Sequence, residues 1–242
     1  MLKYTKGLIA LVTAVSLSSG VTGIGLLEAG AGNVVSHKLH RSTSTFVMQN
    51  NVNVGCPDDQ LLKSVQERDL YGVQSALSHG ANVDTKDSIG WTPLHHAVSL
   101  MDTEMVRLLL AKGATVNTMA NNGWSPLHLA VHRECTHMAE LLLDAGGVVN
   151  NKSDNGNTPL HLAAKGHKIE MVKLLLIHDA DMDSNCNLGR TPLDVAQEQG
   201  SAATAQLLQE AKGARGSSEQ VYKEFRMKLQ AELHKGKNNN NQ

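Results

Sequence analysis

Histidine and cysteine side chains could give this sequence a chemical activity, because imidazoles transfer protons and both groups bind metal ions. The densest group of them consists of His132, Cys135 and His137. His132 and Cys135 are one helical turn apart, yet a tetrahedral structural zinc site needs four ligands, and no second pair lies near them in the sequence. We therefore expect an exposed histidine beside a partly buried thiol here, and no metal site.

Sequence motifs of enzymes are absent. The sequence contains no glycine-rich phosphate loop with a lysine, no G-x-S-x-G turn, no H-E-x-x-H pair and no C-x-x-C pair. Asp58 and Asp59 are adjacent carboxylates, but a charge pair at the start of a helix explains them better than acid–base catalysis does. We expect no catalytic residue and no cofactor, so the chain is predicted not to be an enzyme.

The composition narrows the range of partners. The formal net charge is −1 and only 3% of the residues are aromatic. Without a basic surplus or stacking residues, nucleic acid is not expected as a partner. The three cysteines, Cys56, Cys135 and Cys186, are odd in number and widely spaced, which favours free thiols over a disulfide framework. Cys186 is the one that we least expect to be buried.

A six-residue motif occurs four times in the middle of the chain, each time 33 residues after the last. Its copies are Gly90-Trp-Thr-Pro-Leu-His95, Gly123-Trp-Ser-Pro-Leu-His128, Gly156-Asn-Thr-Pro-Leu-His161 and Gly189-Arg-Thr-Pro-Leu-Asp194. A second marker keeps the same register. It begins at Gly80, Gly113, Gly146 and Asp179. Two markers with one period indicate a repeat protein whose units stack on one another.

Each repeat predicts two short helices. The hydroxyl residue of the motif can cap the first helix, and the proline after it suits the first helical position, where no donor is needed. The second helix carries a run such as Leu108–Leu110 and is apolar over more than one narrow face. Such a helix fits between neighbouring units better than on a surface. No unit can bury its core alone, so stability must come from stacking.

The T-P-L-H box, the 33-residue period and the L-L-L-x-x-G-A segment resemble the ankyrin repeat. The resemblance covers residues 57–213 and implies an all-α solenoid of antiparallel helix pairs with projecting β-hairpin-like loops. Residues 58–89 lack the box and resemble an N-terminal capping repeat. The repeat that starts at Gly189, with its second helix expected at Ala202–Glu210, resembles a C-terminal cap. In this family the histidine of the box is structural and bonds to its own turn, which is the role implied for His95, His128 and His161.

The family's glycine between the two helices of a repeat is present only as Gly200. The corresponding residues in the other repeats are Met101, Glu134 and His167. A side chain in the left-handed region costs about 1–2 kcal/mol, so we expect an array less stable than a consensus one. Gly166, one position early, is a candidate for taking the turn in its own repeat.

The resemblance implies protein binding without naming the partner. In this family the contacts come from the loop tips and from the exposed face of the first helices. The matching positions are Ser88, Ile89, Trp91, Ser99 and Leu100, then Asn121, Asn122, Trp124, His132 and Arg133, then Asp154, Asn155, Asn157 and Lys165, and finally Asn187, Leu188, Arg190 and Glu198. Trp91 and Trp124 are equivalent residues one repeat apart. Each either contacts a partner or packs along its own hairpin.

The N-terminal segment 1–27 has the pattern of a secretory signal peptide. Lys3 and Lys6 precede the apolar core Gly7–Leu17, and Ser18 and Gly20 offer small residues for cleavage. The alternatives are a retained membrane anchor, since the uncharged stretch is long enough to span a bilayer, and a merely apolar tail. Residues 28–56 are rich in small and polar residues and are predicted to be a poorly ordered linker.

The C-terminal segment 214–234 is predicted to be an amphipathic helix. Its apolar residues Val221, Phe225, Leu229 and Leu233 follow one another at four-residue intervals. This helix either packs on the last repeat or docks on a partner or membrane. Residues 235–242 form a Lys/Asn/Gln tract that we expect to be disordered.

Three functional hypotheses remain open, and the third, an enzyme or metal protein, is the one that the sequence supports least and that metal analysis of the purified protein tests. In the first, the chain is a monomeric, non-enzymatic protein-binding module that a bacterium exports to the periplasm or beyond, where it acts on host or envelope proteins. In the second, a retained N-terminal anchor makes it a membrane-tethered scaffold. Cleavage of the N-terminus distinguishes the first two, and an uncleaved soluble chain would instead be cytoplasmic.

Overall fold

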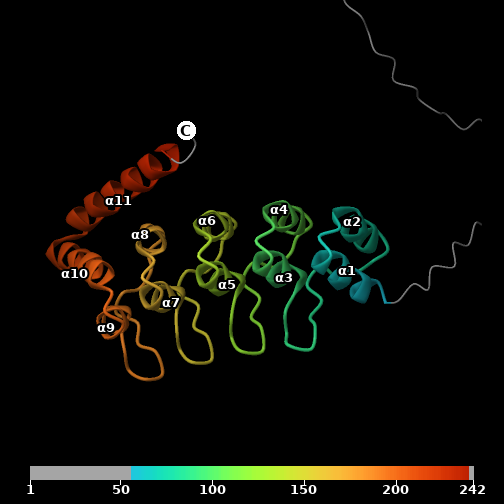
Figure 1. Ribbon diagram of the computed structural model, residues 1–242, viewed down its shortest axis with the longest axis horizontal. Coiled ribbons are helices and arrows are strands. Elements are labelled where there is room, and N and C mark those ends of the chain that lie inside the picture. Colours follow the sequence, from blue (N-terminus) through green and yellow to red (C-terminus); the bar gives the residue numbers. More distant parts are fainter. Residues whose placement is uncertain (1–55, 240–242) are drawn as a thin grey trace, which may run out of the picture. The chain divides into compact units, whose positions relative to one another are not determined.

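The computed structural model describes residues 56–239, and within them every regular element is an α-helix (Figure 1). The predicted all-α fold is therefore confirmed. The helices of the capping unit are α1 (Pro57–Gln66) and α2 (Leu70–Ser78). The next helices are α3 (Pro93–Ser99), α4 (Thr103–Ala111), α5 (Pro126–His132), α6 (Thr136–Asp144), α7 (Pro159–Lys165) and α8 (Ile169–Ile177). The last three are α9 (Pro192–Glu198), α10 (Ala202–Ser217) and α11 (Glu219–Asn239).

The helices alternate between two rows. The inner row consists of α1, α3, α5, α7 and α9, each in contact with the next, and α2, α4, α6, α8 and α10 form the outer row (Figure 1). Four loops project from the inner row on the side away from the outer row. We call them fingers 1 to 4, with residues 84–91, 117–124, 150–157 and 183–190.

The inner helices begin as the sequence predicts. Thr92 caps α3 by accepting a hydrogen bond from the backbone N–H of His95, and Pro93 follows at the first helical position. Ser125 caps α5 in the same way. The same hydroxyl-proline pair starts each later inner helix, so the repeated motif fixes where the inner row starts.

The turns between paired helices hold side chains in the left-handed region. Met101, Glu134 and His167 have φ angles of 56°, 62° and 56°, as the sequence predicts. The interpretation that Gly166 takes this turn is wrong, because its φ is −90°. The backbone N–H of residue 168 bonds to the carbonyl of residue 163, and this closure places residue 167 at the left-handed position. Arg68 and Asp179 adopt the same conformation.

Leucines and methionines fill the space between the rows. Leu109, Leu142 and Leu175, which occupy the same place in successive repeats, are all 0% exposed. Leu94 and Leu160 of the inner row belong to the same core and are also fully buried. One core therefore runs through all the repeats instead of closing within each.

At the C-terminal end, α10 continues seven residues beyond the predicted Glu210, so the expected domain boundary at Gly213 falls within a helix. The last helix, α11, lies against α8 and α10 (Figure 1). Leu229 is 3% exposed there, and Phe225 and Leu233 pack against the core. The amphipathic face is thus used inside the molecule.

Two details of α11 differ from the sequence prediction. Val221 is 43% exposed, and Tyr222 takes its place in the packed face. A strict four-residue spacing drifts by about 40° per step around a helix of 3.6 residues per turn, so the first member of the predicted stripe points away from α8. In addition, α11 continues to Asn239, so the tract expected to be disordered is helical as far as that residue.

The outer face of α8 explains why α11 docks there. Ile169 and Ile177 are partly buried against the core, whereas α6 has Thr136 and Asp144 at the corresponding positions. Polar contacts add to the apolar ones, because Lys173 lies 3.1 Å from a carboxylate oxygen of Glu232. Arg226 also bonds to the carboxylate of Asp179 and to the carbonyl of Ile177.

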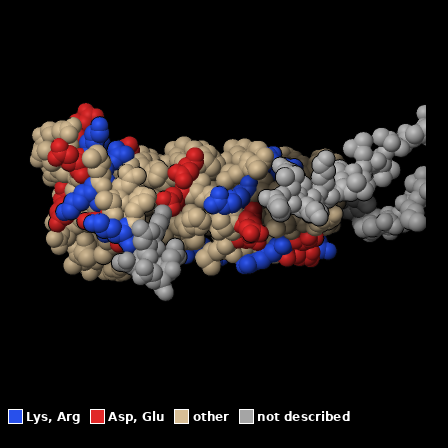
Figure 2. Space-filling model, turned by 90° about the horizontal axis from the view of Figure 1, so that it is seen from above, with Lys and Arg blue, Asp and Glu red and all other residues tan. Residues whose placement is uncertain are grey.

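None of the described helices is long and apolar enough to cross a membrane. The predicted signal peptide or anchor (1–27) and the predicted linker, up to residue 55, lie outside the described residues. Seen from the outer row, acidic and basic side chains are interspersed and neither sign dominates (Figure 2).

Candidate functional site

Each finger ends in a tight turn closed by two backbone hydrogen bonds. In finger 1, the N–H of Asp87 donates to the carbonyl of Trp91 and the N–H of Gly90 donates to the carbonyl of Asp87, both at 3.0 Å. Gly90 has a φ of 78°, and the glycines of the other three motifs are also left-handed. The glycine of each motif is therefore needed to turn the chain back toward the inner helix.

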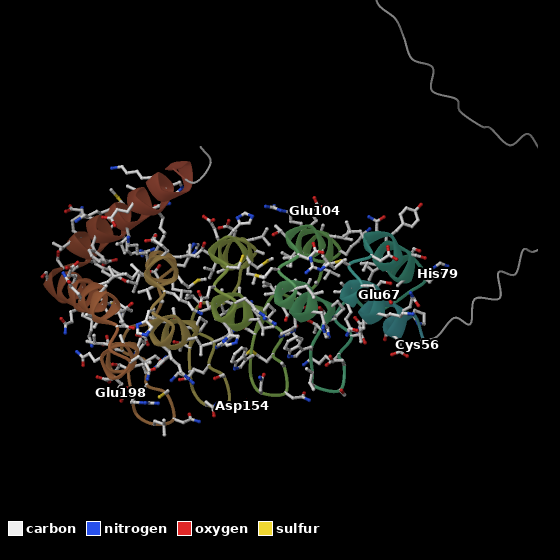
Figure 3. All side chains as sticks on the ribbon, viewed as in Figure 1. Cys56, Glu67, His79, Glu104, Asp154 and Glu198 are labelled. Carbon is white, nitrogen blue, oxygen red and sulfur yellow. The ribbon has the colours of Figure 1, made fainter. Side chains whose placement is uncertain are left out.

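Hydrogen bonds join each finger to the next. The backbone N–H of Asn121 donates to Ile89 O, and its side-chain amide donates to Ser88 O, both at 3.1 Å. Asn187 repeats this arrangement on finger 3, with its N–H on Asn155 O at 3.0 Å and its amide on Asp154 O at 2.7 Å. We call this set of bonds between finger tips the tip ladder. Asp154, whose carbonyl accepts the side-chain amide of Asn187, lies at the far end of finger 3 from the helices (Figure 3).

The histidines of the motif bind two repeats together. Nδ1 of His95 accepts a hydrogen bond from the backbone N–H of Thr92 at 3.2 Å, so the proton is assigned to Nε2, which donates to Trp124 O at 3.1 Å. His128 and His161 reach the next finger in the same way, through Asn157 O and Arg190 O. These contacts agree with the structural role implied for the three residues and add a link between repeats.

Burial keeps these imidazoles neutral. It lowers the pKa of His95 to about 4, even though the bond to the Trp124 carbonyl acts in the opposite direction. Burial likewise lowers the pKa of His128 and of His161. The series ends at Asp194, whose carboxylate accepts the Thr191 N–H at 2.8 Å but has no proton to donate to a further finger.

Trp91 and Trp124 occupy the base of fingers 1 and 2 and are half-buried. The ring of Trp91 stacks on His95 and meets the edge of His96 at a centroid distance of 5.2 Å. Trp124 stacks on His128 and meets His132 at the same distance. Packing along the hairpin thus fixes the orientation of both rings and leaves part of each exposed.

All of the predicted contact residues are exposed or half-buried, and none belongs to the core. The structure brings the tip residues into one line along the ladder. Ile89 and Leu188, at its two ends, are the most apolar of them and are 52% and 73% exposed. Two of the predicted contact residues also link successive repeats, because the Arg133 guanidinium donates a hydrogen bond to the Ser99 hydroxyl at 2.9 Å. The side chain of Arg190 pairs with Glu198 within its own repeat.

The sequence interpretation missed two polar links on this side. His96 lies 2.9 Å from the carboxylate of Asp87, beneath the Trp91 ring. Lys168 donates to Val131 O at 2.8 Å and lies 3.4 Å from the Glu134 carboxylate, so it joins two inter-helix turns. Lysine at position 168 does not recur in the other repeats, so the repeat pattern gave no signal for it.

The cysteines are free, and their burial differs from the prediction. Cys186 is buried and Cys56 is exposed. Cys186 occupies the turn position that Asp87 has in finger 1, where backbone N–H groups close around the side chain. Burial raises the pKa of the Cys186 thiol, but the N–H groups of Leu188 and Arg190 and the Arg190 guanidinium outweigh it, so the pKa lies below its usual value.

Within the described residues, no three His, Cys, Asp or Glu side chains gather closely enough to hold a metal ion. The group His132, Cys135 and His137 is no exception. His132 ends α5 against Trp124, and Cys135 precedes α6 at its N-cap.

The sequence matches the family model described as ankyrin repeats (3 copies) over residues 61–153 and 145–219. A curated protein called 2-5A-dependent ribonuclease, from Mus musculus, is 43% identical over 53 residues, which is 22% of this chain and 7% of the relative. The Homo sapiens protein of the same name is 46% identical over 50 residues, 20% of this chain and 7% of the relative. The chain thus spans 7% of the length of these relatives, and a match of that extent does not carry over a ribonuclease activity.

Proposed function

The chain belongs to the ankyrin-repeat family, and on that premise we propose that it is a non-enzymatic module that binds another protein. The binding surface in this proposal consists of the four fingers and the exposed face of the inner row. Repeats of this family typically serve as binding modules, and the tips are arranged here as a continuous row that side chains of a partner can follow.

Trp91 and Trp124 are the observation that carries the proposal. Tryptophan is among the residues that contribute most to binding energy in interfaces. These two lie one repeat apart at the base of adjacent fingers, and stacking on histidines fixes each ring before any partner arrives. A partly exposed, oriented aromatic ring costs little entropy on binding.

A site-specific cross-linking experiment tests this surface. A photo-reactive residue replaces Asn122 on finger 2, and a matched control replaces Gln74 on α2, since both positions are exposed. We expect a partner protein to cross-link from position 122 and not from position 74. The double variant Trp91→Ala/Trp124→Ala should weaken binding of that partner at least about tenfold, as expected when hot-spot residues are truncated, with a smaller effect on stability.

The two readings of the tryptophans predict different results. If the double variant loses stability and binding in equal measure, the rings serve packing and the proposal loses its main support. Cross-linking from position 74 alone would place the interface on the outer row and contradict the proposal directly.

We propose further that the chain is a monomer exported by a bacterium, to act on host or envelope proteins. The support is the sequence of Lys3, Lys6, the apolar core Gly7–Leu17 and the small residues Ser18 and Gly20. Mass measurement of the mature protein tests the export: a chain that begins near Val21 in the soluble exported fraction supports it. A full-length soluble chain in the cytoplasm contradicts it.

Retention of the N-terminus as an anchor is the second candidate, which would make the chain a membrane-tethered scaffold. The observation in its favour is that no charged residue occurs from Gly7 to Leu27, a stretch that continues past the proposed cleavage site. Full-length protein in the membrane fraction, resistant to extraction by high salt, is the result that favours the anchor.

A further inference from the structure

The tip ladder has an open end at finger 4. In the first three fingers the glycine of the motif is buried under the following finger. A Cβ atom added to Gly90, Gly123 or Gly156 would lie 2.3 Å, 2.5 Å or 2.4 Å, respectively, from the nearest atom of that finger. Gly189 is the equivalent residue of finger 4. It is exposed, and a Cβ atom there would meet nothing within 4 Å. The space that the next finger fills in the other repeats is therefore free at finger 4.

Hydrogen-bond acceptors line this free space. In finger 1 the carbonyls of Ser88 and Ile89 accept the side-chain amide and the backbone N–H of Asn121. The carbonyls at the same positions of finger 4 belong to Asn187 and Leu188. Neither accepts a hydrogen bond from the residues that the structure describes. The Leu188 side chain beside them is 73% exposed.

The C-terminal cap covers the base of finger 4 but not its tip. In fingers 1 and 2 the base is linked onward through Asp84, which accepts the Thr115 N–H at 2.8 Å, and Asn117, which accepts the Val148 N–H at 2.7 Å. At finger 4, Asp183 pairs instead with Lys212 of α10 at 2.7 Å. The cap thus takes the place of a further repeat at the base, and at the tip it leaves the carbonyls of Asn187 and Leu188 without a donor among the described residues.

We propose that this edge, Asn187 to Gly189, docks a turn of the partner protein that carries an asparagine. The proposal rests on the protein-binding function and assigns one contact within it. The partner's turn takes the position that finger 2 takes on finger 1. Its asparagine donates the backbone N–H to Leu188 O and the side-chain amide to Asn187 O, and the turn covers the Leu188 side chain.

The preference for asparagine follows from the two places where both bonds of the ladder form. Asn121 and Asn187 each supply a backbone N–H and a side-chain amide, whereas Asp154 supplies only the N–H. A second copy of this chain fits less well, because the residue that its finger 1 would present is Ser88, which has no amide group. Charge plays no part in the selection, since both acceptors are neutral carbonyls.

A peptide with the sequence of finger 2 is a direct probe. Cyclised residues 117–125, which contain Asn121, are added to the isotope-labelled full chain, and the backbone amide and carbonyl NMR shifts are followed. We expect saturable shifts at residues 187–190 and none at residues 122–123, where the ladder is already paired. The peptide with Asn121→Ala should bind about fivefold more weakly because it loses one hydrogen bond.

Two glycine variants of the chain provide the matched pair. Gly189→Ala places a methyl group where the docked turn must lie and should weaken peptide binding about tenfold or more. Gly200→Ala is the control, because Gly200 has a φ of 70°, close to the 72° of Gly189, and also has nothing near its Cβ position. The control carries the same backbone strain at the far end of α9 and should bind the peptide within about twofold of the wild type.

Three outcomes overturn the inference. They are an absence of saturable shifts at residues 187–190, equal binding by the Gly189→Ala and Gly200→Ala chains, and self-association of the wild type that Gly189→Ala abolishes, since the occupant is then a second copy. The Trp91→Ala/Trp124→Ala chain keeps finger 4 intact, so its peptide binding should be unchanged. Failure of the broader function and failure of this contact are therefore distinguishable.

Discussion

The helices and the fingers of the same repeats are held together by different forces. Between the rows of helices, leucines such as Leu142 and Leu175 are 0% exposed and contribute burial that depends little on direction. The fingers contain no comparable core. They are joined through hydrogen bonds such as Asn121 to Ile89 and His95 to Trp124, whose geometry is directional.

This difference suggests a division of roles within each repeat. Burial between helices supplies most of the stability but tolerates small shifts of one repeat on the next. The ladder and the histidine links supply less energy, and they determine where each finger tip lies relative to its neighbour. Substitutions in the helical core and in the fingers should therefore differ in how much they change the free energy of unfolding and in whether that change depends on pH.

The largest effect should come from the helical part. Leu175→Ala leaves a cavity between α8 and its neighbours and should lower the free energy of unfolding by about 2–5 kcal/mol. Leu142→Ala, one repeat earlier, should cost a similar amount. Urea denaturation measures both, and the loss should be the same at pH 7 and pH 5.5. A loss below about 1 kcal/mol would mean that the stacking of helices is not the main source of stability.

Acid should act mainly on the fingers. The folded protein keeps His95 neutral down to a pKa of about 4, whereas the unfolded chain takes up the proton near pH 6.5, so the unfolded state binds more protons in between. The contribution of His95 to the free energy of unfolding is fully present above pH 6.5. It should fall by about 3 kcal/mol as the pH drops toward 4.

The variant His95→Gln sharpens the acid experiment. A glutamine at this position can still accept the Thr92 N–H but does not titrate. Urea midpoints from pH 7.5 to 4.5 should therefore decline less steeply in the variant than in the wild type. Identical slopes would show that His95 is not buried as a neutral group. Asp194 does not interfere, because its pKa is lowered and it titrates below the usual carboxylate range.

Removing the imidazole altogether should have an intermediate effect. His95→Ala leaves the Thr92 N–H and the Trp124 carbonyl without partners and should destabilise the protein by about 1–3 kcal/mol. Metal analysis of purified wild type and variant should give the same content. A metal present in the wild type and lost in His95→Ala would contradict the structural role of this histidine.

The smallest effect has the opposite sign. Glu134 adopts a φ of 62°, so Glu134→Gly should stabilise the protein by a few tenths of a kcal/mol to about 1 kcal/mol. Glu134→Ala is the control, because it removes the contact with Lys168 and keeps the strain. Thermal midpoints should rank glycine above wild type and alanine below it. A glycine variant that melts below the wild type would refute the strain argument.

The sequence predicted what depends on one repeat alone. The caps at Thr92 and Ser125 and the left-handed turns at Met101 and Glu134 follow from local residue types and register, and the structure has them. The preference of glycine for turns was misleading at Gly166. The turn position there is fixed by the hydrogen-bond closure between the helices, and that constraint outweighs the residue's own preference.

The sequence could not predict what depends on how one repeat sits on the next. The bond of His95 to Trp124 O and the docking of α11 on α8 both require distances between separate units. For the contact surface, exposure of the predicted residues follows from the family register. The open edge at Gly189 became visible only once the three occupied edges could be compared with it.

The docking of α11 has a consequence for how the array comes apart. A linear stack unfolds from its ends, because a terminal unit loses only one interface. At the N-terminal end none of the described helices packs across α2 as α11 packs across α8, and Tyr71 of α2 is 85% exposed. At the other end α11 lies across both α8 and α10, so the last two units cannot detach one at a time. We therefore expect local opening to proceed from α1 and α2 toward the C-terminus, and backbone amides of α8 to exchange with solvent later than those of α2.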